Sequence, residues 1–265
     1  MAEPAAGTQL TLLGSTEPVD DDRLAELYAY PPADPSDGGR CWVRSNFIAS
    51  LDGAATLYGR SGDLAGPGDR ALFQMMRELA DVVLVGAGTI RVENYSGVQL
   101  GASQREARRG RGQSEVPPVA IVTQSGRLDR DLRVFTNTEV PPLVLTCTDS
   151  VPEATARLGG HAEVIDSSGA HPSAVDPEAA LHALATRGLL RVLTEGGPTL
   201  QGALVEQGLL DELCLTVAPV IVAGDARRIT HAPLEKTISM RRAHLLSDEA
   251  GYLYSRYVRD GEAGA

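Results

Sequence analysis

Short apolar runs rich in valine alternate with helical patterns along most of this chain, and this alternation limits the fold more than any other feature. The runs predict strands at residues 42–50, 81–86, 119–123, 143–146, 190–194 and 212–218. Such runs are typical of strands that are buried on both faces. Helical patterns lie between them, at residues 67–79, 152–158, 177–187 and 199–207. The alternation predicts an α/β fold, with a mixed, mostly parallel central sheet and helices on both faces.

The two ends of the chain differ from this pattern. Residues 242–246 and 252–258 flank a polar turn and predict a C-terminal antiparallel hairpin. We expect residues 1–40 to form a poorly ordered lead-in with one short helix at residues 20–30. Residues 41–259 then make up a single domain, and residues 260–265 form a polar tail.

The composition restricts the partners of the protein. The 24 Lys and Arg residues are outnumbered by 35 Asp and Glu, which gives a net charge of −11 and predicts no nucleic-acid partner. No stretch approaches ~18 apolar residues, and the first residues lack the features of a signal peptide. We therefore expect no membrane association and a cytoplasmic location. The three cysteines and five histidines show no metal-ligand spacing, so we expect no metal.

Two turns at predicted strand ends combine glycines with polar side chains. In α/β sheets, ligands bind beyond the carboxyl ends of strands. Residues 49–53 (ASLDG) contain Asp52, which either orders the turn or takes part in chemistry; from these residues alone the turn is favoured. Residues 85–89 (VGAGT) let the backbone at Gly86 and Gly88 approach a phosphate, and Thr89 adds a hydroxyl group. The third glycine of the dinucleotide fingerprint is absent.

The turn at residues 194–200 (TEGGPTL) is the most informative of the three. Gly196 and Gly197 leave backbone amides bare, and Pro198 suits the first position of a helix. With the Thr199 hydroxyl they predict an anion cradle at a helix N-terminus. Glu195 directs a carboxylate into the same crevice, where it needs a ligand rich in hydrogen-bond donors. The alternative is an ordinary turn that binds nothing.

Residues 101–113 form a basic segment in this acidic chain, with Arg105, Arg108, Arg109 and Arg111 against Glu106 alone. Guanidinium groups bind phosphate in bidentate fashion. A solvated surface loop is an equally good interpretation. The residues do not decide between the two.

The turns SLDG, VGAGT and TEGGPTL, with the later segment from Asp211 to Gly224, resemble the reductase domain of riboflavin biosynthesis over roughly residues 42–258. That domain is half of a bifunctional deaminase/reductase and also occurs alone. The resemblance implies a dihydrofolate-reductase-like fold, a homodimer and NADPH as hydride donor. It also implies reduction of the ribosyl group of a phosphoribosylamino-pyrimidine, a small-molecule substrate, to ribityl.

The resemblance also assigns site residues. Glu195, Asn46 and Ser61 match substrate contacts, and Glu195 and Asp52 are the candidate proton donors. The residues matching cofactor contacts are Ile48, Ala49, Gly86, Gly88, Thr89, Glu93, Ser125, Gly196, Gly197, Pro198, Thr199 and Leu200.

The chain departs from the family on the substrate side. Asn46 stands where a Lys is common, and Gly97 and Leu100 replace a Leu and an Arg that contact substrate. Loss of this Arg leaves two explanations: the basic segment replaces it, or the substrate lacks that phosphate. These departures keep two alternatives open, which are a reductase of a pterin or dihydrofolate-type substrate and an NADP-binding protein without turnover.

Overall fold

One sheet crosses the whole molecule. The computed structural model describes residues 17–32 and 39–260, in which nine strands are ordered β5-β4-β3-β2-β6-β1-β7-β9-β8. The strands are β1 (Trp42–Ser50), β2 (Val82–Gly86), β3 (Val119–Val122), β4 (Leu143–Thr146), β5 (Glu163–Asp166), β6 (Arg191–Thr194), β7 (Glu212–Ala218), β8 (Met240–Ser247) and β9 (Leu253–Arg259). The helices are α1 (Asp21–Leu27), α2 (Pro67–Leu79), α3 (Ala87–Val92), α4 (Ala102–Gly110), α5 (Arg133–Thr136), α6 (Val151–Leu158), α7 (Pro177–Ala185) and α8 (Pro198–Glu206), with a 3₁₀ turn, η2, at Thr148–Ser150.

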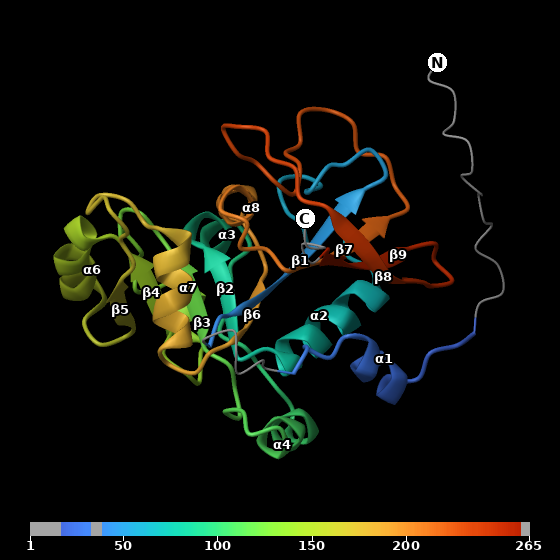
Figure 1. The fold of residues 1–265 in the computed structure, drawn as a ribbon, viewed down its shortest axis with the longest axis horizontal. Helices are drawn as coiled ribbons and strands as arrows, with labels where there is room; N and C mark the ends of the chain where they lie inside the picture. The colour runs from blue at the N-terminus through green and yellow to red at the C-terminus, as the bar shows by residue number, and fades with distance from the viewer. Residues whose placement is uncertain (1–16, 33–38, 261–265) are drawn as a thin grey trace, which may run out of the picture.

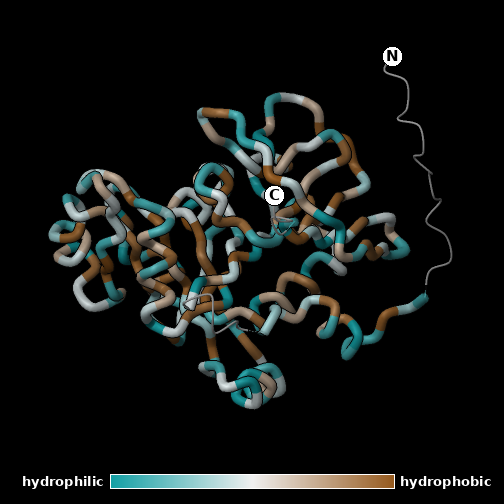
Figure 2. The backbone as a smooth tube through the Cα atoms, viewed as in Figure 1, coloured by the Kyte–Doolittle hydropathy of each residue, from teal (hydrophilic) through white to brown (hydrophobic). Residues whose placement is uncertain are grey.

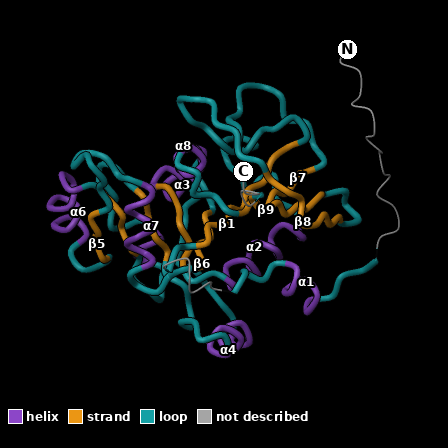
Figure 3. The backbone as a smooth tube through the Cα atoms, in the orientation of Figure 1, coloured by secondary structure: helices purple, strands orange, loops and turns teal. Residues whose placement is uncertain are grey.

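The strand directions confirm the predicted fold class. All pairings from β5 through β7 are parallel. The C-terminal hairpin of β8 and β9 then joins β7 in antiparallel fashion. Figures 1 and 3 show the helices on both sides of this sheet.

Two hydrophobic cores lie on the two faces of the sheet. In β2, Val83 and Val85 belong to the core that packs against α2, α3 and α5, whereas Val82 and Leu84 belong to the core under α7 and α8. Successive strand side chains point to opposite faces, so a strand covered on both sides must be apolar throughout. In Figure 2, hydrophobic residues run along the strands of the sheet.

The N-terminal segment packs onto the sheet. The predicted short helix is α1, which begins after Asp20, where the side chain accepts a hydrogen bond from the Arg23 amide at 2.8 Å. Tyr28 follows α1 and is 1% exposed, within the same core as α2. One face of this segment, formed by Leu24, Leu27, Tyr28 and Tyr30, therefore packs against the core. The remaining expectations for the ends concern residues 1–16, 33–38 and 261–265, which lie outside the described residues.

Candidate active site

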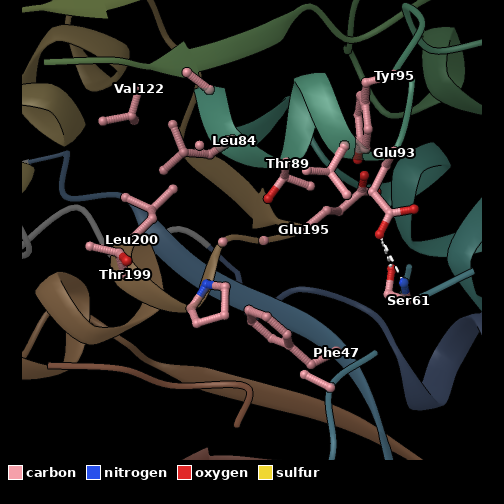
Figure 4. Close-up of a pocket in the computed structure, with 18 of the residues that line it drawn as sticks. Phe47, Ser61, Leu84, Thr89, Glu93, Tyr95, Val122, Glu195, Thr199 and Leu200 are labelled. Atoms are coloured by element: carbon pink, nitrogen blue, oxygen red, sulfur yellow. Dashed lines mark hydrogen bonds between the residues drawn. The ribbon is translucent and has the colours of Figure 1, made fainter. Parts of the chain in front are cut away.

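A cleft of about 1180 Å³ opens at the carboxyl ends of β1, β2, β3 and β6. Its walls come from these strand ends and from α2, α3 and α8. This is the place that the strand-end rule predicts for a ligand. Figure 4 shows the cleft with an apolar group, Leu84, Val122 and Leu200, on one side and Ser61 with Glu93 on the other.

Two glycine turns form the centre of the cleft. The Gly86 amide donates to the Gly196 carbonyl at 3.0 Å, which holds the turn after β2 against the turn after β6. Gly196 and Gly197 have φ values of 134° and 90°, which L side chains rarely adopt. A Cβ atom at either position would also lie 3.4 Å from the Thr89 hydroxyl oxygen. Both positions therefore require glycine.

The glycine turns fit the phosphates of a dinucleotide. α8 begins after Gly197 without a side-chain cap, so its first backbone amides are available to an anion. Thr89, Ser125 and Thr199 line the cleft and can add hydroxyl donors. The apolar side chains next to them offer a surface for a nucleotide base. The residues present thus fit a nicotinamide dinucleotide.

Ser61 and Glu93 meet at the other end of the cleft. Both the amide and the hydroxyl group of Ser61 donate to Glu93 Oε1, at 2.8 and 3.0 Å (Figure 4). Glu93 follows α3 directly, so this carboxylate ties the loop around Ser61 to the end of that helix. The two residues matched here to substrate and cofactor contacts are therefore neighbours.

Glu195 is bound to Arg77, a residue that the sequence analysis missed. Arg77 Nε and Nη2 donate to Oε1 and Oε2 of Glu195 at 2.8 and 2.7 Å. The Arg77 guanidinium stacks 4.0 Å from the ring centre of Phe73, and Tyr95 lies 5.2 Å away. Burial raises the pKa of the Glu195 carboxyl group, and the charge of Arg77 works against this shift. No local sequence signal marks Arg77, because a charged side chain in a helix is usually solvated.

Asp52, the other candidate proton donor, does not line the cleft. Its carboxylate accepts hydrogen bonds from the Ser50 hydroxyl and from the amides of Val222 and Ala223. These bonds lower its pKa to about 2. A carboxylate held ionised in this way orders a turn and is a poor acid. The structure thus favours the turn interpretation.

Most other predicted site residues surround the cleft. They are Asn46, Ile48, Ser61, Gly86, Gly88, Thr89, Glu93, Ser125, Glu195, Gly196, Gly197, Pro198, Thr199 and Leu200. Ala49 is buried and lies outside the cleft lining. The replaced positions Gly97 and Leu100 also lie outside it, because Gly97 abuts Thr138 and Leu100 belongs to the core.

The basic segment lies away from the cleft, so its phosphate-capture interpretation is not supported. It forms α4, below α2 in Figure 1. Arg108 is 0% exposed and donates to the carbonyl groups of Glu78, Ala80 and Ser114. The other three pair with carboxylates: Arg105 with Glu139, Arg109 with Glu115, and Arg111 with Glu78. The arginines that do line the cleft are Arg70, Arg77, Arg91 and Arg227.

Solved structures share this architecture. A pyrimidine reductase-like protein from Corynebacterium diphtheriae matches with a TM-score of 0.77 and 27% identity, over 90% of this chain and 99% of that one. A riboflavin biosynthesis reductase from Saccharomyces cerevisiae shares the fold at 14% identity, with a TM-score of 0.63 over 90% and 98% of the two chains. The fold and the cleft define a pyrimidine reductase-like α/β protein.

The family follows from the sequence comparison. The model of the RibD C-terminal domain matches residues 41–254, and this chain belongs to that family. A relative from Methanothermobacter thermautotrophicus is 30% identical over 191 residues, which cover 72% of this chain and 83% of the relative. That relative is named 2,5-diamino-6-ribosylamino-4(3H)-pyrimidinone 5′-phosphate reductase. The resemblance drawn from the three turns is therefore confirmed. Within the described residues, no helix is long and apolar enough to cross a membrane.

Proposed function

We propose that this protein is an NADPH-dependent reductase that converts the ribosyl group of a phosphoribosylamino-pyrimidine to ribityl in riboflavin biosynthesis. One observation carries the proposal: Glu195 directly precedes the glycine cradle at Gly196 and Gly197, and all three line the same cleft. A substrate that touches this carboxylate lies beside a dinucleotide bound at the glycines. The position of the chain within a family of reductases supports the same reaction.

The cofactor half of the cleft lies around the two glycine turns. The amides of Gly196 and Gly197 and the start of α8 would hold the pyrophosphate. Arg91 lines this cleft and is a suitable partner for a 2′-phosphate, which distinguishes NADPH from NADH. Bound there, the cofactor supplies a hydride. The close packing of the turns after β2 and β6 fixes the cradle before any ligand arrives.

The substrate half lies between α2 and the Ser61 loop. Phe47 and Phe73 line it and offer aromatic faces to a pyrimidine ring. Glu195, oriented by Arg77, accepts hydrogen bonds from the sugar hydroxyl groups. Arg227 is a cleft cation available to the substrate phosphate. It would replace the arginine that the family has where this chain has Leu100.

The reaction delivers a hydride to C1′ of the opened sugar and a proton to the adjacent nitrogen. Of the two candidate donors, only Glu195 lines the cleft, and burial raises the pKa of its carboxyl group. The chain otherwise contributes position: it holds the reacting carbons near contact and excludes water.

Loss of nicotinamide absorbance tests this function, with NADPH and either the pyrimidine substrate or dihydrofolate. The proposal requires turnover of the pyrimidine. Turnover of dihydrofolate alone would replace it with the pterin-type reductase, and tight NADPH binding without any turnover would replace it with the binding protein. Glu195→Gln should retain NADPH binding and lose turnover.

We further propose a cytoplasmic homodimer. The three cysteines are free and buried, as expected in a reducing compartment. Two exposed apolar side chains on the edge hairpin, Leu245 on β8 and Leu253 on β9, suit contact with a second copy. Light scattering in solution measures the assembly, and a monomer at all concentrations would contradict it.

A further inference from the structure

One face of α2 carries an acidic, an aromatic and a basic side chain that all line the cleft. Asp69, Phe73 and Arg77 are four residues apart, and all three line the cavity. Residues at this spacing lie on the same side of a helix, one above the other. Arg77 is committed to Glu195, and Phe73 stacks on Arg77. Asp69 has no part in the function proposed so far.

The start of α2 holds Asp69 in a fixed place. A Cβ atom at Gly66 would lie 2.8 Å from the ring of Tyr252, and one at Gly68 would clash with the Tyr254 hydroxyl group. Only glycine lets the first turn of α2 come this close to the C-terminal hairpin. The carboxylate that follows is thus positioned by backbone packing, as a specificity group needs to be.

The carboxylate of Asp69 can accept more hydrogen bonds than its neighbours in the protein donate. The buried Thr216 hydroxyl on β7 donates one hydrogen bond to it, and Arg70 is the neighbouring positive charge. An ionised carboxylate can accept about four hydrogen bonds. Partial burial raises the pKa of Asp69, because the charged form loses water. A ligand that supplies two further donors would satisfy the group.

The two candidate substrates, a 2,5-diaminopyrimidinone and its deaminated uracil counterpart, differ at the C2 and N3 edge of the pyrimidine ring. The 2,5-diaminopyrimidinone named for the relatives has an amino group at C2 beside the N3–H group, so it offers two adjacent donors. In the deaminated uracil counterpart, a carbonyl oxygen replaces that amino group. A carboxylate accepts the two donors of the first in parallel, but it repels the oxygen of the second.

We propose that Asp69 is a specificity-determining residue, which reads the N3–H and 2-amino edge and selects the diaminopyrimidinone over the uracil substrate. The inference rests on the reductase function proposed above. It places the reduction ahead of the hydrolytic deamination that removes the 2-amino group. The pyrimidine ring then lies against Phe73, and its sugar extends along α2 toward Arg77 and Glu195.

Asp69→Asn gives a reciprocal test, since an amide offers one donor and one acceptor and so complements the uracil edge. The kcat/KM of wild type and variant should be measured with both substrates. Wild type should prefer the diaminopyrimidinone. The variant should lose roughly 100-fold with it, the scale of one or two charged hydrogen bonds, and gain with the uracil. Asp63→Asn, at an exposed position outside the cleft lining, is the matched control and should change neither value.

A helix-capping role alone would not invert the substrate preference. An unchanged ratio of the two kcat/KM values, or an equal loss with both substrates, would overturn the proposal. If Asp69→Asn does not fold, wild type still decides through competition by the free bases. The triaminopyrimidinone should inhibit more strongly than the diaminouracil, and equal inhibition would contradict the proposal. Absence of turnover with both substrates would instead contradict the reductase function.

Discussion

The guanidinium group of Arg77 binds both carboxylate oxygens of Glu195, at 2.8 and 2.7 Å, across 118 residues of sequence. The two side chains are 9% and 2% exposed. Breaking an ion pair this buried strongly destabilises the fold, because the remaining charge is left without a partner. It joins the last turn of α2 to the end of β6 and so fixes the carboxylate next to the glycine cradle.

Removing one partner should therefore cost both stability and activity. We expect Arg77→Met to lower the free energy of unfolding by about 3–5 kcal/mol and to abolish turnover. The double variant with Glu195→Gln should recover part of the stability but none of the activity. Urea unfolding and NADPH oxidation measure the two effects. The exposed pair of Arg105 and Glu139 is the control, where Arg105→Met should cost about 1 kcal/mol or less. Equal losses at the two pairs would contradict the account.

Asp52 should matter for acid stability and leave catalysis unaffected. Its folded-state pKa of about 2 is below the usual value of 3.8, so the folded state binds fewer protons than the unfolded state between these values. This stabilisation is complete above about pH 4 and is lost as the pH falls toward 2. Asp52→Asn should flatten that part of the unfolding curve and keep full turnover at neutral pH. Loss of turnover in a folded variant would restore Asp52 as a proton donor.

Substitutions at Arg108 and Arg227 should distinguish an arginine that stabilises the fold from one that binds the ligand. Arg108→Met leaves the carbonyl groups at the end of α2 without their donor and should cost about 1–3 kcal/mol of stability, with ligand affinity unchanged. Arg227→Ala should leave stability intact and raise the KM of the phosphorylated substrate. Thermal unfolding and steady-state kinetics provide both readouts. The reverse pattern would return α4 to the role of phosphate binder.

Tyr28 tests whether the N-terminal segment belongs to the folded body. Its ring is buried and meets the His244 ring at 4.8 Å. Tyr28→Ala should lower the free energy of unfolding by about 3–5 kcal/mol, the usual cost of a large cavity. Tyr58 is 91% exposed, so Tyr58→Ala should have no measurable effect. Similar unfolding curves for the two variants would show that residues 17–32 do not contribute to the core.

The central strands were predictable because both of their faces are covered, whereas the edge strand β5, which is mostly exposed, was not predicted. Val82 through Val85 are apolar without interruption, as a strand between two helical layers must be. α4 was missed because it lacks an apolar stripe: its buried residue is Arg108, and the groups that satisfy Arg108 lie on α2 and in the loop after α4. The local periodicity of a sequence does not reveal hydrogen-bond partners that lie on other segments of the chain.

The site shows the same limit. Glycine turns at strand ends predict an anion-binding cradle from the sequence alone, because the backbone conformation that requires glycine is a local property. Arg77 gave no such signal, because a charged residue in a helix is usually solvated and its burial depends on Glu195. Asp52 and Glu195 both end strands, and only the packing around them shows that one orders a turn while the other lines the cleft.

Isotope transfer tests the central claim most directly. The protein would be incubated with the ribosylamino-pyrimidine phosphate and NADPH that carries deuterium at the hydride-donating carbon of the nicotinamide ring. Deuterium should appear at C1′ of a ribityl product, and Glu195→Gln should abolish this transfer. A product without deuterium at C1′, or no reduced product while NADPH is bound, would contradict it.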